Sequence, residues 1–208
     1  MEDVLDVYQR PFDASRPVVC VDETSKQLVE HTRERLPAKP GQIACEDDEY
    51  KRCGVGNIFI AVEPIVGTCV TAVTTTRGCV DFAHFVKHLC DVTYAMAATL
   101  VLVLDNLSTH SIGALYTAFE PAEAHRLARK LEIHFTPKHG SWLNMAEIEL
   151  SVLGRQCLDR RISSLGELST EVAAWTAERN ADDAPILWRF TTPDARIKLA
   201  KLYPSRSA

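Results

Sequence analysis

The sequence lacks the long apolar run of a membrane protein and the basic leader of an exported one. Its longest strongly apolar stretch, Ala95 to Leu104, has ten residues and is interrupted by Thr99, whereas a helix that crosses a bilayer needs about 20. The first residues, Met1 to Asp6, are acidic where a secretory or mitochondrial leader is basic. We therefore expect no membrane segment and no leader, and predict a cytoplasmic protein.

Cysteine pairs in the C-x-x-C pattern are also missing. The chain has seven cysteines, an odd number that cannot all pair internally, at positions 20, 45, 53, 69, 79, 90 and 157. We expect reduced, mostly buried thiols in preference to a zinc site. His84 and His88 stand four residues apart and could bind zinc, but no third ligand follows at a readable spacing, so a solvated or satisfied pair is the preferred interpretation.

The chain has no excess of positive charge. Its 23 Lys and Arg against 28 Asp and Glu give a net charge of −5, which argues against a histone-like, generally basic binder of nucleic acid. The balance is uneven, because residues 1–30 hold three basic and seven acidic groups while residues 189–208 hold five basic and one acidic. A contact with a polyanion would therefore use the C-terminal half.

What the chain does contain is an average globular composition and clear periodicity. With 208 residues, 46% hydrophobic and 25% charged, it can bury a core, and we predict a single domain over 1–208. Apolar patterning predicts an α/β fold in the order βββαβαβα. The predicted strands are 17–22, 57–62, 68–76, 99–105 and 133–135, and the predicted helices are 80–92, 112–119, 121–131, 143–159 and 165–179. Residues 24–56 are polar and predict an inserted excursion with little core of its own.

Two of the predicted strands end at an aspartate, Asp22 and Asp105. In an open sheet with crossover helices, sites form in the crevice beyond the carboxyl ends of strands. Two acids meeting there would repel one another unless a cation were bound, and oxygen ligands favour Mg²⁺ or Mn²⁺. For any single Asp, a turn residue at a strand end is the commoner interpretation. The pair favours the cation site.

Three blocks of sequence carry a resemblance to a known family. They are Cys20–Lys26 (CVDETSK), Leu104–His110 (LDNLSTH) and Thr136–Glu147 (TPKHGSWLNMAE). In this order they resemble the signature blocks of the mariner-like DDE transposases, and within these the bacterial insertion sequence 630 family. The resemblance runs from about Pro11 to Pro204 and so covers nearly the whole chain.

The resemblance implies a ribonuclease H-like fold, with a mixed five-stranded sheet flanked by helices. It also implies that Asp22, Asp105 and a helix-borne Glu hold two Mg²⁺ or Mn²⁺ ions that cleave and rejoin DNA. Glu147 and Glu149 both flank the apolar stripe of their helix and point about 200° apart, so the periodicity does not choose between them. The family places its acid three residues after the Asn of a Leu-Asn pair, which here is Asn144, and this selects Glu147.

The resemblance further implies partners and a reaction. The partner would be double-stranded DNA, both element ends and target, bound by a homodimer at the nucleoid, with strand transfer from a freed 3′-hydroxyl. Family members begin with a helix-turn-helix DNA-binding module, which this chain is expected to lack because its first predicted strand begins by residue 17. The alternative function is therefore a truncated, non-catalytic remnant that acts as an interaction module. An aspartyl phosphatase is disfavoured, because Thr24 stands where its D-x-D motif needs a second Asp.

Several polar residues near the blocks are candidate DNA contacts. The loop before the catalytic helix suits phosphate contact and base stacking, and Arg155 could follow a DNA backbone. Each has an ordinary alternative: loop packing, a capping Asn, a surface His or a solvated Arg. The candidates are Asn106, His110, Lys138, His139, Trp142 and Arg155.

Overall fold

The computed structural model describes residues 1–33, 38–43 and 48–203. The strands are β1 (Val18–His31), β2 (Tyr50–Glu63), β3 (Thr68–Thr74), β4 (Leu100–Leu104) and β5 (Leu131–Phe135). The α-helices are α1 (Glu2–Tyr8), α2 (Cys79–His88), α3 (Ile112–Ala118), α4 (Pro121–Lys130), α5 (Ala146–Leu153), α6 (Leu165–Ala181) and α7 (Thr192–Lys198). In these described parts, none of the helices has the length and apolar character needed to span a membrane.

The five strands form one mixed sheet in the order β3-β2-β1-β4-β5. Neighbours β1 and β2, and β2 and β3, are antiparallel, whereas β4 runs parallel to both β1 and β5. All five residues of β4 are buried, as expected for a continuous apolar run in the middle of a parallel arrangement. The predicted α/β fold with a mixed five-stranded sheet is thus confirmed.

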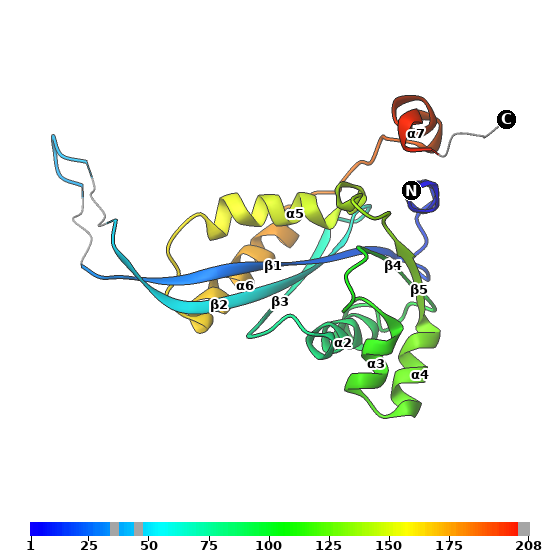
Figure 1. Ribbon diagram of the computed structural model, residues 1–208, viewed down its shortest axis with the longest axis horizontal. Helices are drawn as coiled ribbons and strands as arrows, with labels where there is room; N and C mark the ends of the chain where they lie inside the picture. The colour runs from blue at the N-terminus through cyan, green and yellow to red at the C-terminus, as the bar shows by residue number, and fades with distance from the viewer. Residues whose placement is uncertain (34–37, 44–47, 204–208) are drawn as a thin grey trace.

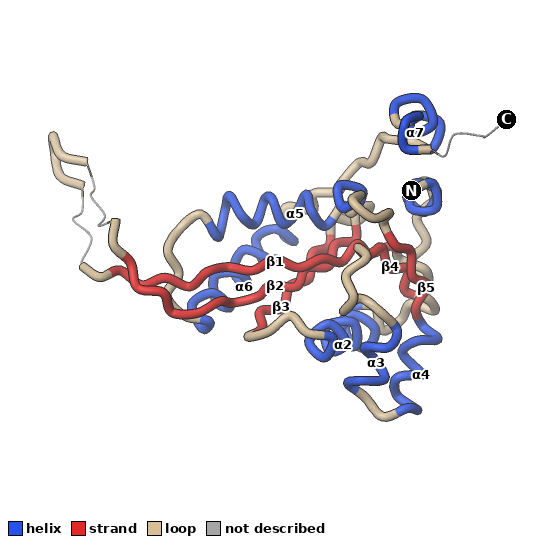
Figure 2. The backbone as a smooth tube through the Cα atoms, viewed as in Figure 1, coloured by secondary structure: helices blue, strands red, loops and turns tan. Residues whose placement is uncertain are grey.

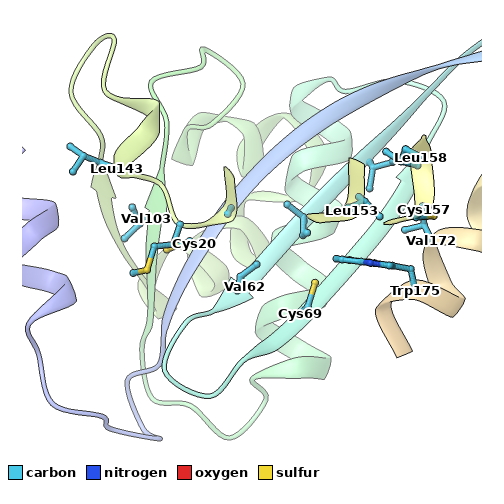
Figure 3. Close-up of a cluster of buried hydrophobic side chains, with 14 of the residues drawn as sticks. Cys20, Val62, Cys69, Val103, Leu143, Leu153, Cys157, Leu158, Val172 and Trp175 are labelled. Atoms are coloured by element: carbon cyan, nitrogen blue, oxygen red, sulfur yellow. The ribbon is translucent and has the colours of Figure 1, made fainter. Parts of the chain in front are cut away.

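Helices cover both faces of this sheet (Figure 1). Because successive strand residues point to opposite faces, Val19 and Val21 pack with the cluster under α2, α3 and α4, and Cys20 packs with the cluster under α5 and α6. Figure 3 shows the second cluster, in which Leu153 and Trp175 lie over the sheet. The two-face pattern fixes which strand residues face α5.

The excursion predicted for 24–56 differs from what the structure has. Strands β1 and β2 do not stop at its borders but continue as an antiparallel ribbon, pairing out to His31 opposite Tyr50, and the ribbon projects from the body of the fold (Figure 2). The outer part of β2 is exposed on both faces, so it has no apolar alternation to reveal a strand. Two pieces of the excursion, 34–37 and 44–47, lie outside the described residues.

Two short helices, α1 and α7, were not predicted, because each has only seven residues, which is too short for a periodic signal. They tie the two ends of the chain together beside the sheet (Figure 1). Arg196 donates two hydrogen bonds to Glu2, at 2.7 and 2.8 Å. Thr192 donates to Asp6 at 2.7 Å, and the Tyr203 hydroxyl donates to Glu2 at 2.9 Å.

The six described cysteines are free. Cys20, Cys69, Cys90 and Cys157 are buried, Cys79 is half-buried and Cys53 is exposed, while Cys45 lies outside the described residues. Burial raises the pKa of the Cys20 thiol to about 11, which keeps it protonated and unreactive near neutral pH.

Candidate active site

The first aspartate lies where β1 loses one of its two neighbours. Strand β1 pairs with β4 only from Val18 to Cys20, so beyond this point β1 has no strand partner on its β4 side. The sequence predicted a strand end at Asp22, whereas β1 continues to His31 and it is the pairing with β4 that ends. Asp22 therefore lies just beyond the end of this pairing, within a strand instead of at its tip.

Strand alternation brings the two aspartates to the same face. Asp22 has the orientation of Cys20, and Asp105, one residue beyond β4, follows the orientation of Val103. Both Cys20 and Val103 belong to the cluster under α5 and α6. The two carboxylates thus project from adjacent parallel strands towards the face that carries α5.

Asp22 is a buried carboxylate among like charges. Only 7% of the residue is exposed. Burial raises the pKa of Asp22 to about 7, against the lowering effect of the Glu23 backbone N–H, which donates to its Oδ1 at 2.9 Å, and the charges of Glu147, Asp105 and Glu23 add to the rise. A carboxylate in this setting is costly to keep ionised without a cation.

Asp105 is held by one of its two oxygens. Its Oδ1 accepts hydrogen bonds from the Leu107 backbone N–H at 3.0 Å and from His110 Nδ1 at 2.6 Å. The bond from His110 lowers the pKa of Asp105 despite partial burial. Burial alone would lower the pKa of His110, but its contacts with Asp105 and Glu23 outweigh this and raise the pKa to about 9.

The structure places His110 in the interior, not on a DNA-facing surface as the sequence suggested. The residue is 1% exposed, and its ring packs against Phe82 with centroids 4.6 Å apart. Its Nε2 lies 2.9 Å from Oε2 of Glu23, whose side chain is 4% exposed. These two atoms are not aligned as a hydrogen bond, so we describe the pair as an electrostatic contact.

The start of α5 is fastened to the first aspartate by Asn144. This residue is fully buried, and its Nδ2 donates to Val21 O at 2.8 Å and, more weakly, to Asp22 Oδ2 at 3.4 Å. Its Oδ1 accepts from the Ala146 backbone N–H at 3.2 Å. The helix predicted from residue 143 therefore begins at Ala146, after a 3-10 turn over residues 141–143.

The two acids of α5 have opposite surroundings. Glu149 is 2% exposed and accepts two hydrogen bonds from Arg179 of α6, at 2.6 and 2.8 Å. Glu147 is exposed, and among the neighbouring carboxylates its charge contributes most to the raised pKa of Asp22. Of the two acids, only Glu147 acts on the pKa of Asp22, which agrees with their separation of about 200° around the helix.

The chemistry of this donor set fits a divalent cation. Asp22, Asp105 and Glu147 offer carboxylate oxygens, the ligands that Mg²⁺ and Mn²⁺ prefer. The three carboxylates do not form a closed metal-binding group, because within the described ranges no three His, Cys, Asp or Glu side chains lie close enough together to hold a metal ion. That finding applies equally to His84 and His88, and the His84 ring packs edge-on against Phe119.

The remaining predicted DNA contacts lie around the site. Lys138 and His139 are exposed in a turn closed by Gly140 N to Pro137 O at 2.8 Å, and His139 has a positive φ of 65°. Trp142 is 48% exposed and stacks edge-on against Phe190.

Two further exposed candidates are engaged in local bonds. Asn106 donates from Nδ2 to Thr136 O, which ties the loop after β4 to the end of β5. Arg155 donates to Ser151 Oγ at 2.5 Å, one turn earlier in the helical segment.

The sequence analysis gave no site role to Glu23 or Arg179, and it used Asn144 only to select Glu147 over Glu149. Glu23 could have been separated from Asp22 by alternation alone, since adjacent strand residues face opposite sides of the sheet. The pairing of Arg179 with Glu149 joins residues 30 apart in the chain, and no local pattern signals it.

Comparisons with known proteins agree with this architecture. The family model described as DDE superfamily endonuclease matches residues 17–169. A search of curated proteins finds no match.

Solved structures of the Mos1 mariner transposase have a similar fold. The paired end complex with Mn has a TM-score of 0.57 at 16% identity, over 90% of this chain and 61% of that one. The strand transfer complex has a TM-score of 0.60 at 15% identity, over 88% and 53%, and the paired-end complex with the left transposon end has 0.58 at 14%, over 88% and 56%. This chain thus spans little more than half the length of those proteins.

At such identities the likeness shows the fold alone. The family model, in contrast, covers most of the chain, from β1 through the first turn of α6, and its span includes both aspartates and Glu147. The chain belongs to the DDE superfamily endonucleases.

Proposed function

We propose that this chain is the catalytic domain of a DNA transposase that cleaves phosphodiesters at element ends and then joins the freed 3′-hydroxyl to target DNA. The observation that carries the proposal is the burial of Asp22 beside Glu147 and Asp105, where the neighbouring charges that raise its pKa are all negative. Strongly perturbed carboxylates in a crevice are typical of functional sites. The family and the DNA complexes named in the structural comparisons support the same reaction class.

In this proposal Asp22, Asp105 and Glu147 would hold two divalent cations, Mg²⁺ or Mn²⁺. When bound, two such cations activate the attacking hydroxyl and stabilise the leaving oxygen. The chain supplies the rigid part, because Asp22 and Asp105 sit on adjacent strands and Asn144 joins β1 to the start of α5. Cys20, the buried thiol nearest to this point in the strand, takes no part as a nucleophile.

DNA would lie over the loop before α5. Lys138 and His139 are exposed there and suit phosphate contact, and the exposed ring of Trp142 suits stacking on a base. Asn106 and Arg155 flank this surface, whereas His110 is withdrawn from the set of DNA contacts because its ring is buried. A homodimer acting on DNA at the nucleoid completes the proposal.

The test is cleavage of supercoiled plasmid by the chain with Mg²⁺ or Mn²⁺, with chelator as the blank. We expect divalent-dependent nicking that is lost in Asp105→Asn, a variant that changes charge with little change in volume. Nicking that survives this substitution would show that a different activity is present. A folded parent that binds DNA without any divalent-dependent cleavage would favour the alternative, a non-catalytic remnant acting as an interaction module.

A further inference from the structure

His110 is enclosed on every side that the structure describes. Its ring packs on Phe82, which is itself 3% exposed, with centroids 4.6 Å apart. Nδ1 lies 2.6 Å from Asp105 Oδ1 and Nε2 lies 2.9 Å from Glu23 Oε2. Alternation places Glu23 on the α2 side of the sheet, so the ring reaches from that layer to the aspartate at the end of β4.

The contacts made by Asp105 all fall on one oxygen. Oδ1 accepts from His110 Nδ1 and from the Leu107 backbone N–H. Across the described part of the chain, Oδ2 makes no hydrogen bond to protein. Two donors on one oxygen fix the rotation of the carboxylate about its last bond and leave Oδ2 available.

We infer that His110 is a positioning residue, which holds Asp105 through Oδ1 so that Oδ2 is the oxygen presented to a divalent cation, while Glu23 holds the ring from its far side. This inference rests on the proposed function, in which Asp105 is a metal ligand. Ligating carboxylates are themselves hydrogen-bonded, and loss of such supporting partners costs about 10- to 100-fold in metal affinity.

A purely structural role predicts a different pattern. In that case the buried trio of Glu23, His110 and Asp105 only stabilises the loop after β4, and either contact of the ring would matter equally. Two amide substitutions separate the contacts, because the side-chain nitrogen of Asn occupies the place of His Nδ1 and that of Gln occupies the place of Nε2. His110→Asn keeps the donor to Asp105, and His110→Gln keeps only a nitrogen beside Glu23.

The experiment measures Mn²⁺ affinity by calorimetry for the parent and both variants, with Asp105→Asn to identify binding at this site. We expect His110→Asn to stay within about threefold of the parent and His110→Gln to bind about 10- to 100-fold more weakly. Equal affinities for the Asn and Gln variants would overturn the inference.

If a single variant fails to fold, the same two amide substitutions are compared in the Glu23→Gln background. In that background the buried side chain at position 23 carries no charge that needs a partner. Glu23→Gln/His110→Asn should bind Mn²⁺ more tightly than Glu23→Gln/His110→Gln, by the same factor. Equal binding by the two double variants would overturn the inference in the same way.

A metal-free measurement keeps the inference separate from the proposed function. Hydrogen exchange of the Leu107 amide reports its bond to Asp105 Oδ1, and it should be faster in His110→Gln than in His110→Asn. If the parent binds Mn²⁺ no better than Asp105→Asn, the proposed function fails. If the parent binds but the Leu107 amide exchanges equally in both His110 variants, the positioning role fails while the proposed function stands.

Discussion

Two groups of charged side chains on either side of α5 invite comparison. Glu147 and Glu149 are two residues apart on one helix, yet one faces Asp22 and the other faces Arg179. The Glu149 group is balanced, with one carboxylate and one guanidinium joined by two hydrogen bonds. In the other group carboxylates lie near carboxylates. Burial and repulsion from these neighbouring charges together raise the pKa of Asp22.

Under the proposed function, the Glu149 group uses charge for structure and the other group uses it for binding a cation. A buried ion pair needs its partner within the fold, since removing one member leaves an uncompensated charge. A buried carboxylate among like charges destabilises the fold as it stands, and such departures are expected where a ligand completes the balance. Neutralising acids in the two groups should therefore produce opposite patterns of activity and stability.

The largest expected effect comes from neutralising the unbalanced group. Glu147→Gln should reduce divalent-dependent plasmid nicking by at least about 10³-fold, because it weakens the binding of a cation that acts on both the attacking and the leaving oxygens. Asp22→Asn and Asp105→Asn should do the same, without added loss when combined. The free energy of unfolding, measured in urea, should change little for Glu147→Gln, because this side chain is exposed. Nicking by Glu147→Gln at the parent's rate would remove this residue from the site.

The balanced group should respond in stability. Glu149→Gln leaves Arg179 without its carboxylate and should lower the free energy of unfolding by about 3 kcal/mol, while the folded fraction keeps nicking near the parent's rate. The measurement is urea denaturation beside the nicking assay. The double variant Glu149→Leu/Arg179→Met removes both charges and should recover most of the loss. A change below about 0.5 kcal/mol in Glu149→Gln would contradict the structural role.

A smaller effect is expected from Lys138, a positive charge that lies outside the group of Asp22, Asp105 and Glu147. Lys138→Gln should weaken DNA binding by about two- to fivefold and reduce the slope of log affinity against log salt by about 1, for an element end and a scrambled duplex alike. Arg129→Gln is the matched control, because Arg129 is exposed on α4 on the opposite face of the sheet. Equal effects of the two variants would show that the loop before α5 is not a specific DNA contact.

The smallest effect should come from a second balanced group, at the surface. His134, Arg10 and Arg16 lower the pKa of Glu132 from its ordinary 4.5 to about 2. Because this pKa is depressed by folding, the stabilisation is present above about pH 4.5 and is lost as the pH falls towards 2.

Glu132→Gln should thus cost less than about 1 kcal/mol at pH 7 and nothing near pH 2. Thermal unfolding of both proteins across this range measures the difference. A gap that stays constant with pH would show that the ionised carboxylate is not the cause.

The sequence predicted the sheet well because its inner strands carry strong signals. The continuous apolar run of β4 and the alternation of Val19, Cys20 and Val21 are local properties of the chain. The outer part of β2 was missed because residues exposed on both faces need no apolar pattern, and this segment is specified by its pairing with β1. Helices α1 and α7 were missed because long-range contacts stabilise them.

For the proposed site, local pattern and family resemblance supplied the candidate acids but not the residues that contact them. Asp22 and Asp105 follow apolar runs, and Glu147 came from its distance to Asn144. The polar context of His110 is typical of a surface histidine, and its burial depends on Phe82 and Glu23, which are remote in sequence. A residue whose role depends on tertiary contacts leaves no pattern in the local sequence.

The ties between α1 and α7 have a consequence for the entropy of the unfolded chain. Glu2 and Arg196 are 194 positions apart, so their contact closes almost the whole polypeptide into a ring. Loop-closure entropy grows only with the logarithm of loop length, so a covalent link between α1 and α7 would remove that entropy from the unfolded ensemble, and the existing contact between the two helices keeps the strain on the folded state small.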